Sequence, residues 1–181
     1  MSILKVSRMG NPVLRTKIKP MPQAEIVSTA VQRLIDDMTQ TMIEYHGVGL
    51  AAPQVHEGVR LFVAHVVTDR DEDPDESAES EVLAIINPEV TAVGRAVEED
   101  WEGCLSVPDI RGLVPRARDI RLRGFDRHGE RVDLQAGGFM ARVIQHETDH
   151  LDGILFLDRM KSFASLSFIE EYARYHAKRE E

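Results

Sequence analysis

The segment His146-Glu147-Thr148-Asp149-His150 has the residue types and spacing of a metal site. Residues four apart lie on one face of an α-helix, so the two imidazoles could bind the same ion. The carboxylate of Glu147 could then take a proton from water held at the site. Five-residue matches of this kind also arise by accident, and a solvated helix surface is the alternative. The motif therefore predicts a metal site that needs further support.

The residues around the motif supply part of that support. Phe139, Val143 and Ile144 recur at helical spacing with the two histidines, and Gly153 is a typical helix end. An apolar face of this kind points into the protein, where imidazole and carboxylate groups without partners cost free energy. The pattern favours a buried ion over a solvated surface.

A third protein ligand is needed, because catalytic sites of this type usually have three ligands and one open position. The metzincin pattern fails, since residue 156 is Phe rather than His. Glu170 and Glu171 could complete a thermolysin-like site, although both fit an exposed helix equally well. Cys104 is another candidate, because a thiol beside a divalent cation is deprotonated. A lone cysteine is more often a small buried apolar residue, so these choices stay open on the residues alone.

Length and composition are typical of one globular domain spanning residues 1–181. The formal net charge of −9 argues against direct, specific DNA binding and against an anionic membrane surface. No apolar stretch approaches the ~20 residues that span a bilayer, and the N-terminus lacks a signal-peptide core. A single cysteine fits a reducing compartment. We therefore expect a cytoplasmic location, no membrane contact, and a solvated loop at the acidic run 69–81.

Hydrophobic periodicity predicts an early helix over residues 23–45, whose apolar stripe includes Val27, and a closing helix over residues 162–178. Alternating and β-branched segments predict strands and a hairpin between them, at residues 59–67, 82–86, 90–97 and 120–134. This order of elements predicts an α+β fold. We expect mixed or antiparallel β-sheets packed around a central HExxH helix, with an N-terminal and a C-terminal helix.

Two further segments accompany the histidine motif: GVGLAAPQ at residues 47–54 and EGCLSVP at residues 102–108. Together with QHETDHLDG at residues 145–153, they closely resemble, in order and spacing, the three signature motifs of the peptide deformylases. Similar stretches at residues 8–15 and 114–117 extend the resemblance, which covers roughly residues 3–165.

The resemblance implies that Cys104, His146 and His150 hold one divalent metal ion, with water in the fourth position. Fe²⁺ is the ion expected in the cell, and Zn²⁺, Ni²⁺ or Co²⁺ could occupy the same site. A bound metal would lower the pKa of its water. Glu147 would accept the proton and return it to the departing amine.

The implied reaction removes the formyl group from the formylmethionine of newly made polypeptides and releases formate. The side chain of Gln54 and the backbone N–H of Leu105 would donate hydrogen bonds to the oxygen that gains negative charge. The extended peptide would lie against the backbone of Val48, Gly49 and Gly103, where a side chain would obstruct it.

An apolar pocket would receive the methionine side chain, with Val48, Phe139, Val143 and the ring of His146 as its walls. Arg142 departs from the apolar residue of the best-known bacterial members, so the side-chain preference of the pocket stays open. The acidic run 69–81 resembles an insertion of variable type.

Two weaker inferences follow from the same segments. Glu102 and Arg116 are expected to form a pair that orients the amide of Gln54. Cations near the C-terminus, within residues 172–179, are compatible with a transient ribosome contact.

Two alternatives to a deformylase are an HExxH metallopeptidase that cleaves internal bonds and a non-catalytic metal-binding homologue. The first predicts a third ligand downstream of His150. The second predicts loss of Glu147 or Gln54, because structural ligation needs neither residue. Both residues are present, which favours catalysis.

Overall fold

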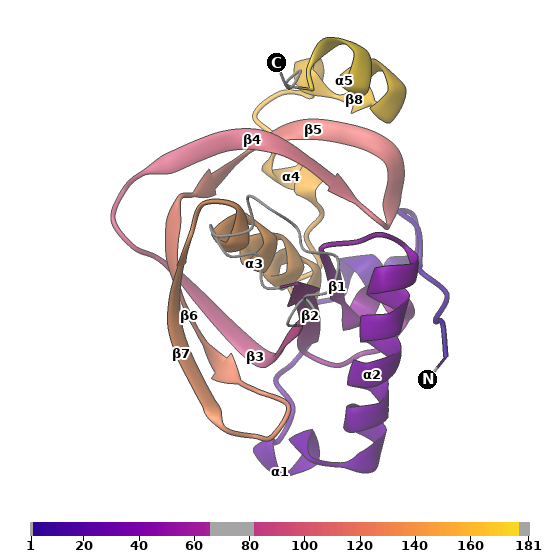
Figure 1. The fold of residues 1–181 in the computed structure, drawn as a ribbon, viewed down its shortest axis with the longest axis vertical. Coiled ribbons are helices and arrows are strands. Elements are labelled where there is room, and N and C mark those ends of the chain that lie inside the picture. The colour runs from indigo at the N-terminus through magenta and orange to yellow at the C-terminus, as the bar shows by residue number, and fades with distance from the viewer. Residues whose placement is uncertain (1, 66–81, 178–181) are drawn as a thin grey trace, which may run out of the picture.

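The computed structural model describes residues 2–65 and 82–177, which form helices and two antiparallel sheets. In Figure 1, helix α3 (Gly138–Leu151) lies within the curve of the strands, and helix α2 (Thr29–Glu44) lies beside β1 and β2. This arrangement is an α+β fold with antiparallel sheets, as the sequence predicts. The acidic run 69–81 lies outside the described residues.

The larger sheet has five strands, in the spatial order β1 (Gly49–Ala51), β2 (Leu61–His65), β3 (Val82–Ala92), β6 (Asp119–Phe125) and β7 (Arg131–Gly137). The smaller sheet has three, in the order β4 (Val97–Cys104), β5 (Val107–Ala117) and β8 (Ser167–Phe168). Neighbouring strands are antiparallel in both sheets, and β4 and β5 arch over the end of α3 in Figure 1.

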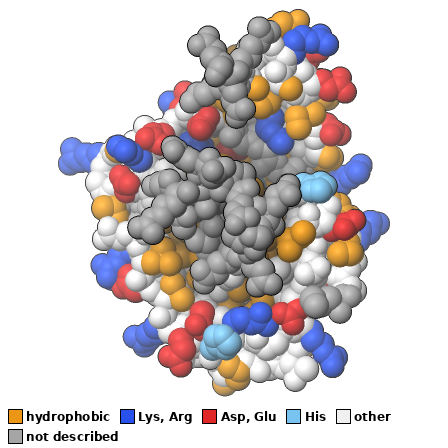
Figure 2. All heavy atoms as spheres, viewed as in Figure 1, with side chains coloured by type: hydrophobic (Ala, Val, Ile, Leu, Met, Phe, Trp, Pro, Cys, Tyr) orange, Lys and Arg blue, Asp and Glu red, His pale blue; other side chains and the backbone are white. Residues whose placement is uncertain are grey.

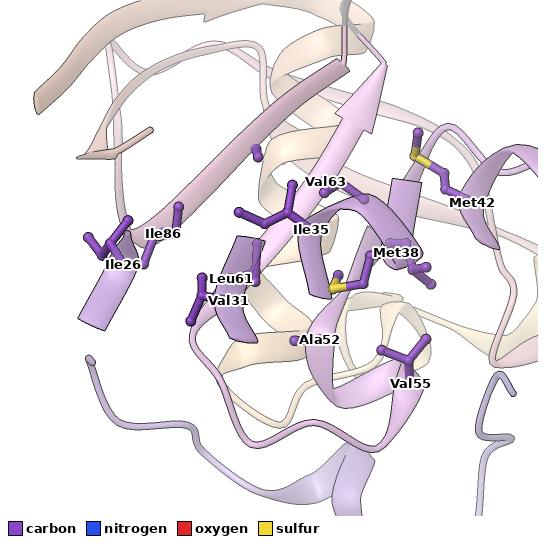
Figure 3. Packing of buried hydrophobic residues seen from close by; sticks show 12 residues of the cluster. Ile26, Val31, Ile35, Met38, Met42, Ala52, Val55, Leu61, Val63 and Ile86 are labelled. Atoms are coloured by element: carbon purple, nitrogen blue, oxygen red, sulfur yellow. The ribbon is translucent and has the colours of Figure 1, made fainter. Parts of the chain in front are cut away.

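Strand β2 shows why helices pack on both faces of the larger sheet. Alternate residues of a strand point to opposite faces. Leu61 and Val63 pack with α2, whereas Phe62 and Ala64 pack with residues of α3. All four are fully buried. Figure 3 shows the α2 side of this core, where Met38 lies among branched aliphatic side chains and fills the space between them.

Helix α3 has the apolar face that the sequence predicts except at Phe139, which is half exposed. Ala141, Ile144 and Leu151 are fully buried against the larger sheet. The helix ends at Leu151, and Gly153 follows with a positive φ of 74°. A Cβ at this glycine would lie 2.7 Å from the backbone carbonyl of Arg15, so the chain can turn here only without a side chain.

The early helix is two helices rather than the single helix expected over residues 23–45. Helix α1 (Gln23–Ile26) ends before Ser28, whose hydroxyl accepts a hydrogen bond from the N–H of Val31 and caps α2. Val27 lies at the break and is 59% exposed, so its place in the apolar stripe was wrong.

The strands also differ from the prediction in two places: β4 and β5 were not expected as strands, and two expected segments are joined into one. The segments expected at residues 82–86 and 90–97 are one strand, β3, with a bulge after Ile86 where Asn87 adopts a φ of 52°. The Asn87 side chain exchanges two hydrogen bonds with the backbone of Met21, which fixes this kink. The hairpin of β6 and β7, with its turn at residues 126–129, is confirmed.

The C-terminal region contains a strand where a continuous helix over residues 162–178 was expected. A short 3-10 helix, η3 (Phe163–Ser165), precedes β8, which pairs with β5, and only then does α5 (Ile169–Tyr175) begin. The rings of Tyr172 and His176 each lie 4.9 Å from that of Trp101 on β4. Pairing with β5 thus overrides local helix preference.

Three short helices complete the described chain: η1 (Pro12–Arg15), η2 (Ala52–Val55) and α4 (Phe156–Arg159). Among the helices of the described residues, none is long and apolar enough to cross a membrane.

Candidate metal and catalytic site

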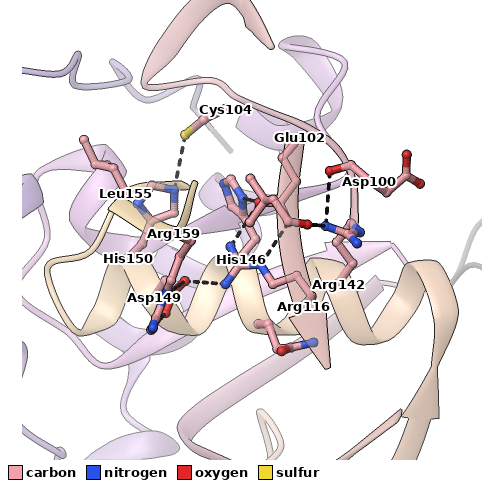
Figure 4. A network of polar contacts seen from close by, with 12 residues as sticks. Asp100, Glu102, Cys104, Arg116, Arg142, His146, Asp149, His150, Leu155 and Arg159 are labelled. Carbon is pink, nitrogen blue, oxygen red and sulfur yellow. Dashed lines mark hydrogen bonds and ion pairs between the residues drawn. The ribbon is translucent and has the colours of Figure 1, made fainter. Parts of the chain in front are cut away.

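Cys104, His146 and His150 come together although they belong to different elements. Cys104 ends β4, immediately before the Leu105–Ser106 turn into β5, and both histidines lie on α3. The sulfur of Cys104 is 3.2 Å from Nε2 of His150, and Figure 4 shows it directed at that ring. One potential ligand atom from each of the three residues lies within 4.8 Å of the others, and all three residues are buried.

Glu102 holds the ring of His146 from the side opposite the cluster. Its Oε2 lies 2.9 Å from Nδ1 of His146, as Figure 4 shows. Since a carboxylate can only accept, this contact makes Nδ1 the donor, and in the neutral imidazole it leaves the lone pair of Nε2 free to bind a metal. Burial alone would raise the pKa of Glu102, but hydrogen bonds from His146 and Arg116 outweigh it and lower the pKa to about 2.

The Cys104 thiol is poised to ionise. Burial opposes the charged form, but His150 and His146 beside the sulfur lower its pKa well below the usual range. A thiolate with two imidazole nitrogens is a donor set that suits Fe²⁺, Zn²⁺, Ni²⁺ and Co²⁺. The three residues therefore fit a divalent transition metal, which is consistent with the expectation from the sequence.

Glu147 lies beside this cluster without a hydrogen-bonding partner for one of its oxygens. The residue is 4% exposed, and its Oε2 has no partner within the described chain. Burial raises the pKa of this carboxyl to about 7. A group with such a pKa can accept and return a proton near neutral pH. A Cβ at Gly49 would lie 2.5 Å from Oε1 of Glu147, so glycine makes room for the carboxylate.

Gln54 is fixed with its amide nitrogen facing the sulfur. Its Oε1 accepts a hydrogen bond of 2.8 Å from the N–H of Ala51. Its Nε2 donates to Oγ of Ser106 at 3.2 Å and lies 3.6 Å from Sγ of Cys104. The side chain is 1% exposed, so this orientation is locked by packing and by hydrogen bonds. A donor held in this way can stabilise negative charge that develops beside the cluster.

A cavity of about 770 Å³ opens onto these groups. Its lining includes all five residues expected to bind substrate, Val48, Gly49, Gly103, Phe139 and Val143. Val48 and Phe139 are 45% and 51% exposed and form the rim, whereas Val143 is buried. A larger groove of about 1200 Å³, between residues 17–20 and the β6–β7 hairpin, contains none of the metal-binding or proton-transfer candidates, so size does not identify the site.

Comparison with known proteins decides the family. A model of the family described as polypeptide deformylase matches residues 3–165. The chain belongs to the polypeptide deformylase family. It is 41% identical over 170 residues to peptide deformylase 2 of Nostoc sp., covering 94% of this chain and 93% of that protein. It is 43% identical over 169 residues to peptide deformylase 2 of Ralstonia nicotianae, covering 93% of each.

Solved structures of the family agree with the fold. The crystal structure of a class I type b peptide deformylase from Acinetobacter baumannii with Met-Ala-Ser bound gives a TM-score of 0.79 at 37% identity, covering 88% of this chain and 100% of that one. The crystal structure of peptide deformylase from Thermotoga maritima gives a TM-score of 0.77 at 35% identity. The match covers 90% of this chain and 100% of that one. Peptide deformylases are metal-dependent enzymes that remove the N-terminal formyl group from formylated nascent peptides.

One expectation for this deformylase-family site needs correction. The pair between Glu102 and Arg116 exists, with contacts of 2.9 and 3.0 Å, but the carboxylate orients His146. The amide of Gln54 is held instead by Ala51 and Ser106, as described above. Ser106 was not singled out from the sequence, although a hydroxyl two residues after the cysteine was a signal for it.

Arg142 left the side-chain preference of the pocket open in the sequence, and the structure shows that its guanidinium turns inward. The residue is 6% exposed, and Nη1 lies 2.8 Å from both Oε1 of Glu102 and the carbonyl of Val114. Its Nη2 donates to the carbonyl of Glu98 at 2.8 Å. Arg142 therefore ties α3 to β4 and β5 at the level of the cluster. A polar residue four positions before His146 on a buried helix face was the signal in the sequence.

A second carboxylate, Asp149, extends this network. It lies between Arg116 and Arg159, and its Oδ1 accepts from Nη2 of Arg159 at 2.6 Å. Figure 4 shows the series of contacts that runs from Arg159 through Asp149 and Arg116 to Glu102. Charged groups from α3, α4, β4 and β5 thus form one network that holds the Glu102 carboxylate against the ring of His146.

Proposed function

We propose that this chain hydrolyses the formamide of N-formylmethionyl peptides at the cavity described above. Cys104, His146 and His150 would hold one divalent metal ion, and Glu147 would transfer protons. The observation that carries the proposal is that the three ligand atoms gather in one buried group beside Glu147, whose Oε2 has no partner among the described residues. The family of the chain supports the same reaction.

The bound metal would supply a water of lowered pKa and polarise the formyl oxygen. Glu147 takes a proton from the water that adds to the formyl carbon, and later gives it to the amine nitrogen as the C–N bond breaks. The products are formate and a free N-terminal amine. A pKa of about 7 suits both steps, because the carboxyl must act as base and then as acid.

Two donors would stabilise the oxygen that becomes negative. Nε2 of Gln54 is held beside Cys104, and the backbone N–H of Leu105 follows Cys104 at the turn between β4 and β5. Removing one such donor generally costs about 10²–10³ in rate. Because Ser106 and Ala51 fix the Gln54 amide beforehand, the site needs no reorganisation when charge develops.

The peptide would lie extended along the backbone at Val48, Gly49 and Gly103, with its methionine side chain against Val143 and Phe139. All five residues line the same cavity as the candidate catalytic groups. The relative crystallised with Met-Ala-Ser supports a peptide of this kind as ligand. A formyl group presents the least hindered acyl carbon.

Four finer proposals accompany this function. Residues 1–181 form one catalytic domain with the HExxH helix at its centre, a view that the position of α3 in Figure 1 supports. Fe²⁺ is the native ion, and the substrate class places the enzyme in the cytoplasm. Residues 172–179 make transient ribosome contact, which ribosome co-sedimentation of the full chain and of a chain lacking residues 170–181 would test. Equal sedimentation of both would contradict the last proposal.

The deciding experiment measures formate release from formyl-Met-Ala-Ser, with metal content determined on anaerobically purified protein. The wild-type chain should release formate, and Glu147→Ala should keep the metal and lose turnover. Cys104→Ala should lose both. Metal retained by Cys104→Ala, with cleavage of internal peptide bonds, would support the metallopeptidase alternative. Retained activity in Glu147→Ala would contradict the proton-transfer role.

A further inference from the structure

The mouth of the substrate cavity carries unpaired positive charge. Lys5, Arg8 and Arg111 line this cavity, and within the described chain none of them forms an ion pair. Arg142 also lines it, but Glu102 neutralises that guanidinium. The whole chain has a formal net charge of −9, so the mouth has the opposite sign to the protein. We call Lys5, Arg8 and Arg111 the cationic rim.

Acidic residues in the same lining do not cancel this charge. Asp109 is exposed at the mouth and opposes the three cations of the rim. Glu102 and Glu147 are buried, at 5% and 4% exposure. Glu102 is already shared by Arg116 and Arg142. A peptide entering the cavity therefore meets a net positive field.

Lys5 and Arg8 are held in place by the backbone on which they stand. The N–H of Ser7, between them, donates to the carbonyl of Gln54 at 2.7 Å, and two residues later the chain donates to the carbonyl of Ser106 at 2.7 Å. The N-terminal segment thus binds the backbone of Gln54, the candidate oxyanion donor, and of Ser106, which helps to fix the Gln54 amide. Its two charges stay at the edge of the site instead of moving with a free terminus.

Arg111 reaches the mouth from the opposite strand. Its guanidinium occupies the space that a side chain at Gly103 would fill, so glycine there accommodates the protein's own arginine. That guanidinium donates one hydrogen bond, from Nη1 to the carbonyl of Ile110, at 3.2 Å. A guanidinium has five N–H donors, so most remain available to a ligand. They lie beside Gly103, where the peptide backbone is proposed to run.

We propose that the cationic rim makes this enzyme prefer formylated peptides with acidic side chains in the first few residues after methionine. The inference rests on the proposed function. A formylated N-terminus is uncharged, so the side chains that follow set the charge of the substrate near the site. Exposed charge pairs are weak and screened by salt, so two or three of them correspond to roughly a tenfold preference at low ionic strength.

The test compares three amidated peptides, formyl-Met-Ala-Asp-Asp, formyl-Met-Ala-Ser-Ser and formyl-Met-Ala-Lys-Lys, on metal-loaded full-length enzyme. We expect kcat/KM for the Asp peptide to exceed that for the Lys peptide roughly tenfold, mainly through KM, and the ratio to shrink about threefold or more in 0.5 M NaCl. Amidation removes the C-terminal carboxylate, which would otherwise mask the effect.

A matched pair of variants locates the effect. The double variant Lys5→Gln/Arg8→Gln should reduce the Asp-to-Lys ratio to roughly threefold or below. Lys19→Gln/Arg131→Gln removes the same charge from the other groove and should leave the ratio as in the wild type. Equal ratios in the two double variants would overturn the proposal, as would a wild-type ratio near one.

Calorimetric affinities for the same peptides separate this inference from the function on which it rests. If no formate is released but the Asp peptide still binds more tightly than the Lys peptide, the deformylase reaction is overturned and the role of the cationic rim is supported. Formate release with equal affinities for all three peptides would overturn the rim alone.

Discussion

Arg142→Leu should destabilise the protein and loosen its metal site together. The guanidinium is 6% exposed and makes three contacts of 2.8 Å, with Glu102, Val114 and Glu98. Removing one partner of a buried ion pair costs about 3–5 kcal/mol, and Leu leaves two carbonyls without this donor. Arg116 still compensates the charge of Glu102, so we expect the free energy of unfolding to fall by about 3 kcal/mol, the lower end of that range. For a chain of this size that lowers Tm by about 6–12 °C.

Loss of metal should accompany loss of stability, because Arg142 and Arg116 are the two guanidinium groups that position the Glu102 carboxylate behind His146. Changing a group that orients a ligating histidine typically costs about 10–100-fold in metal affinity or activity. We expect the rate of Co²⁺ loss to a chelator to rise within that range. The thiolate-to-cobalt absorption band of the loaded variant should shift or broaden.

The assays are a thermal scan and a chelator-release time course, both at fixed metal concentration, because bound metal itself raises Tm. Arg121→Leu is the matched control, since Arg121 forms an exposed ion pair with Asp133 and should change Tm by about 2 °C or less. Arg142→Lys should recover part of the lost Tm and metal retention, because an ammonium can still make one contact with Glu102. A Tm for Arg142→Leu within 2 °C of the wild type, with unchanged release, would refute this reasoning.

Three further predictions concern single positions. Gly49→Ala should lower kcat about 10–100-fold with metal content unchanged, because the new Cβ displaces the Glu147 carboxylate. Steady-state kinetics on metal-quantified protein would show this decrease. An unaltered kcat would contradict the position assigned to Glu147. Glu102→Gln should weaken metal affinity about 10–100-fold in chelator competition, since the ring of His146 loses a charged acceptor; an unchanged affinity would count against that role. Gly153→Ala should lower the free energy of unfolding by about 1–3 kcal/mol in urea while leaving kcat intact, because its φ of 74° strains a side chain; equal stability would show that the turn can relax.

The part of the site that lies on one helix could be predicted from the sequence. The spacing of His146 and His150 is a local property of α3, and so is the place of Glu147 between them. Cys104 is different, because it lies 46 residues from His150 and reaches it only through the path of β4. The residues alone left that ligand open, and the resemblance to the deformylases supplied it.

The errors in the predicted fold arose where a nonlocal contact or a side-chain hydrogen bond overrides hydrophobic periodicity. The apolar stripe continues through Val27, but the hydroxyl of Ser28 caps a new helix and the chain breaks there. The residues near Phe168 fit a helix, yet they pair with Ile110 on β5, more than 50 residues earlier. Hydrophobic periodicity reports neither kind of contact, because each depends on the position of a particular polar group or partner strand.

Arg142 shows what a resemblance transfers and what it does not. Matching the family's motif placed this residue beside the proposed substrate cavity, and the lining of that cavity includes Arg142. The direction of its side chain follows from a different cause, namely the charges within its reach. Glu102 lies 2.8 Å away and is buried, so an arginine on this face gains more by turning inward than by remaining at the rim. The charge that a peptide meets at the mouth therefore comes from residues outside the three motifs or beside them, above all Lys5, Arg8 and Arg111.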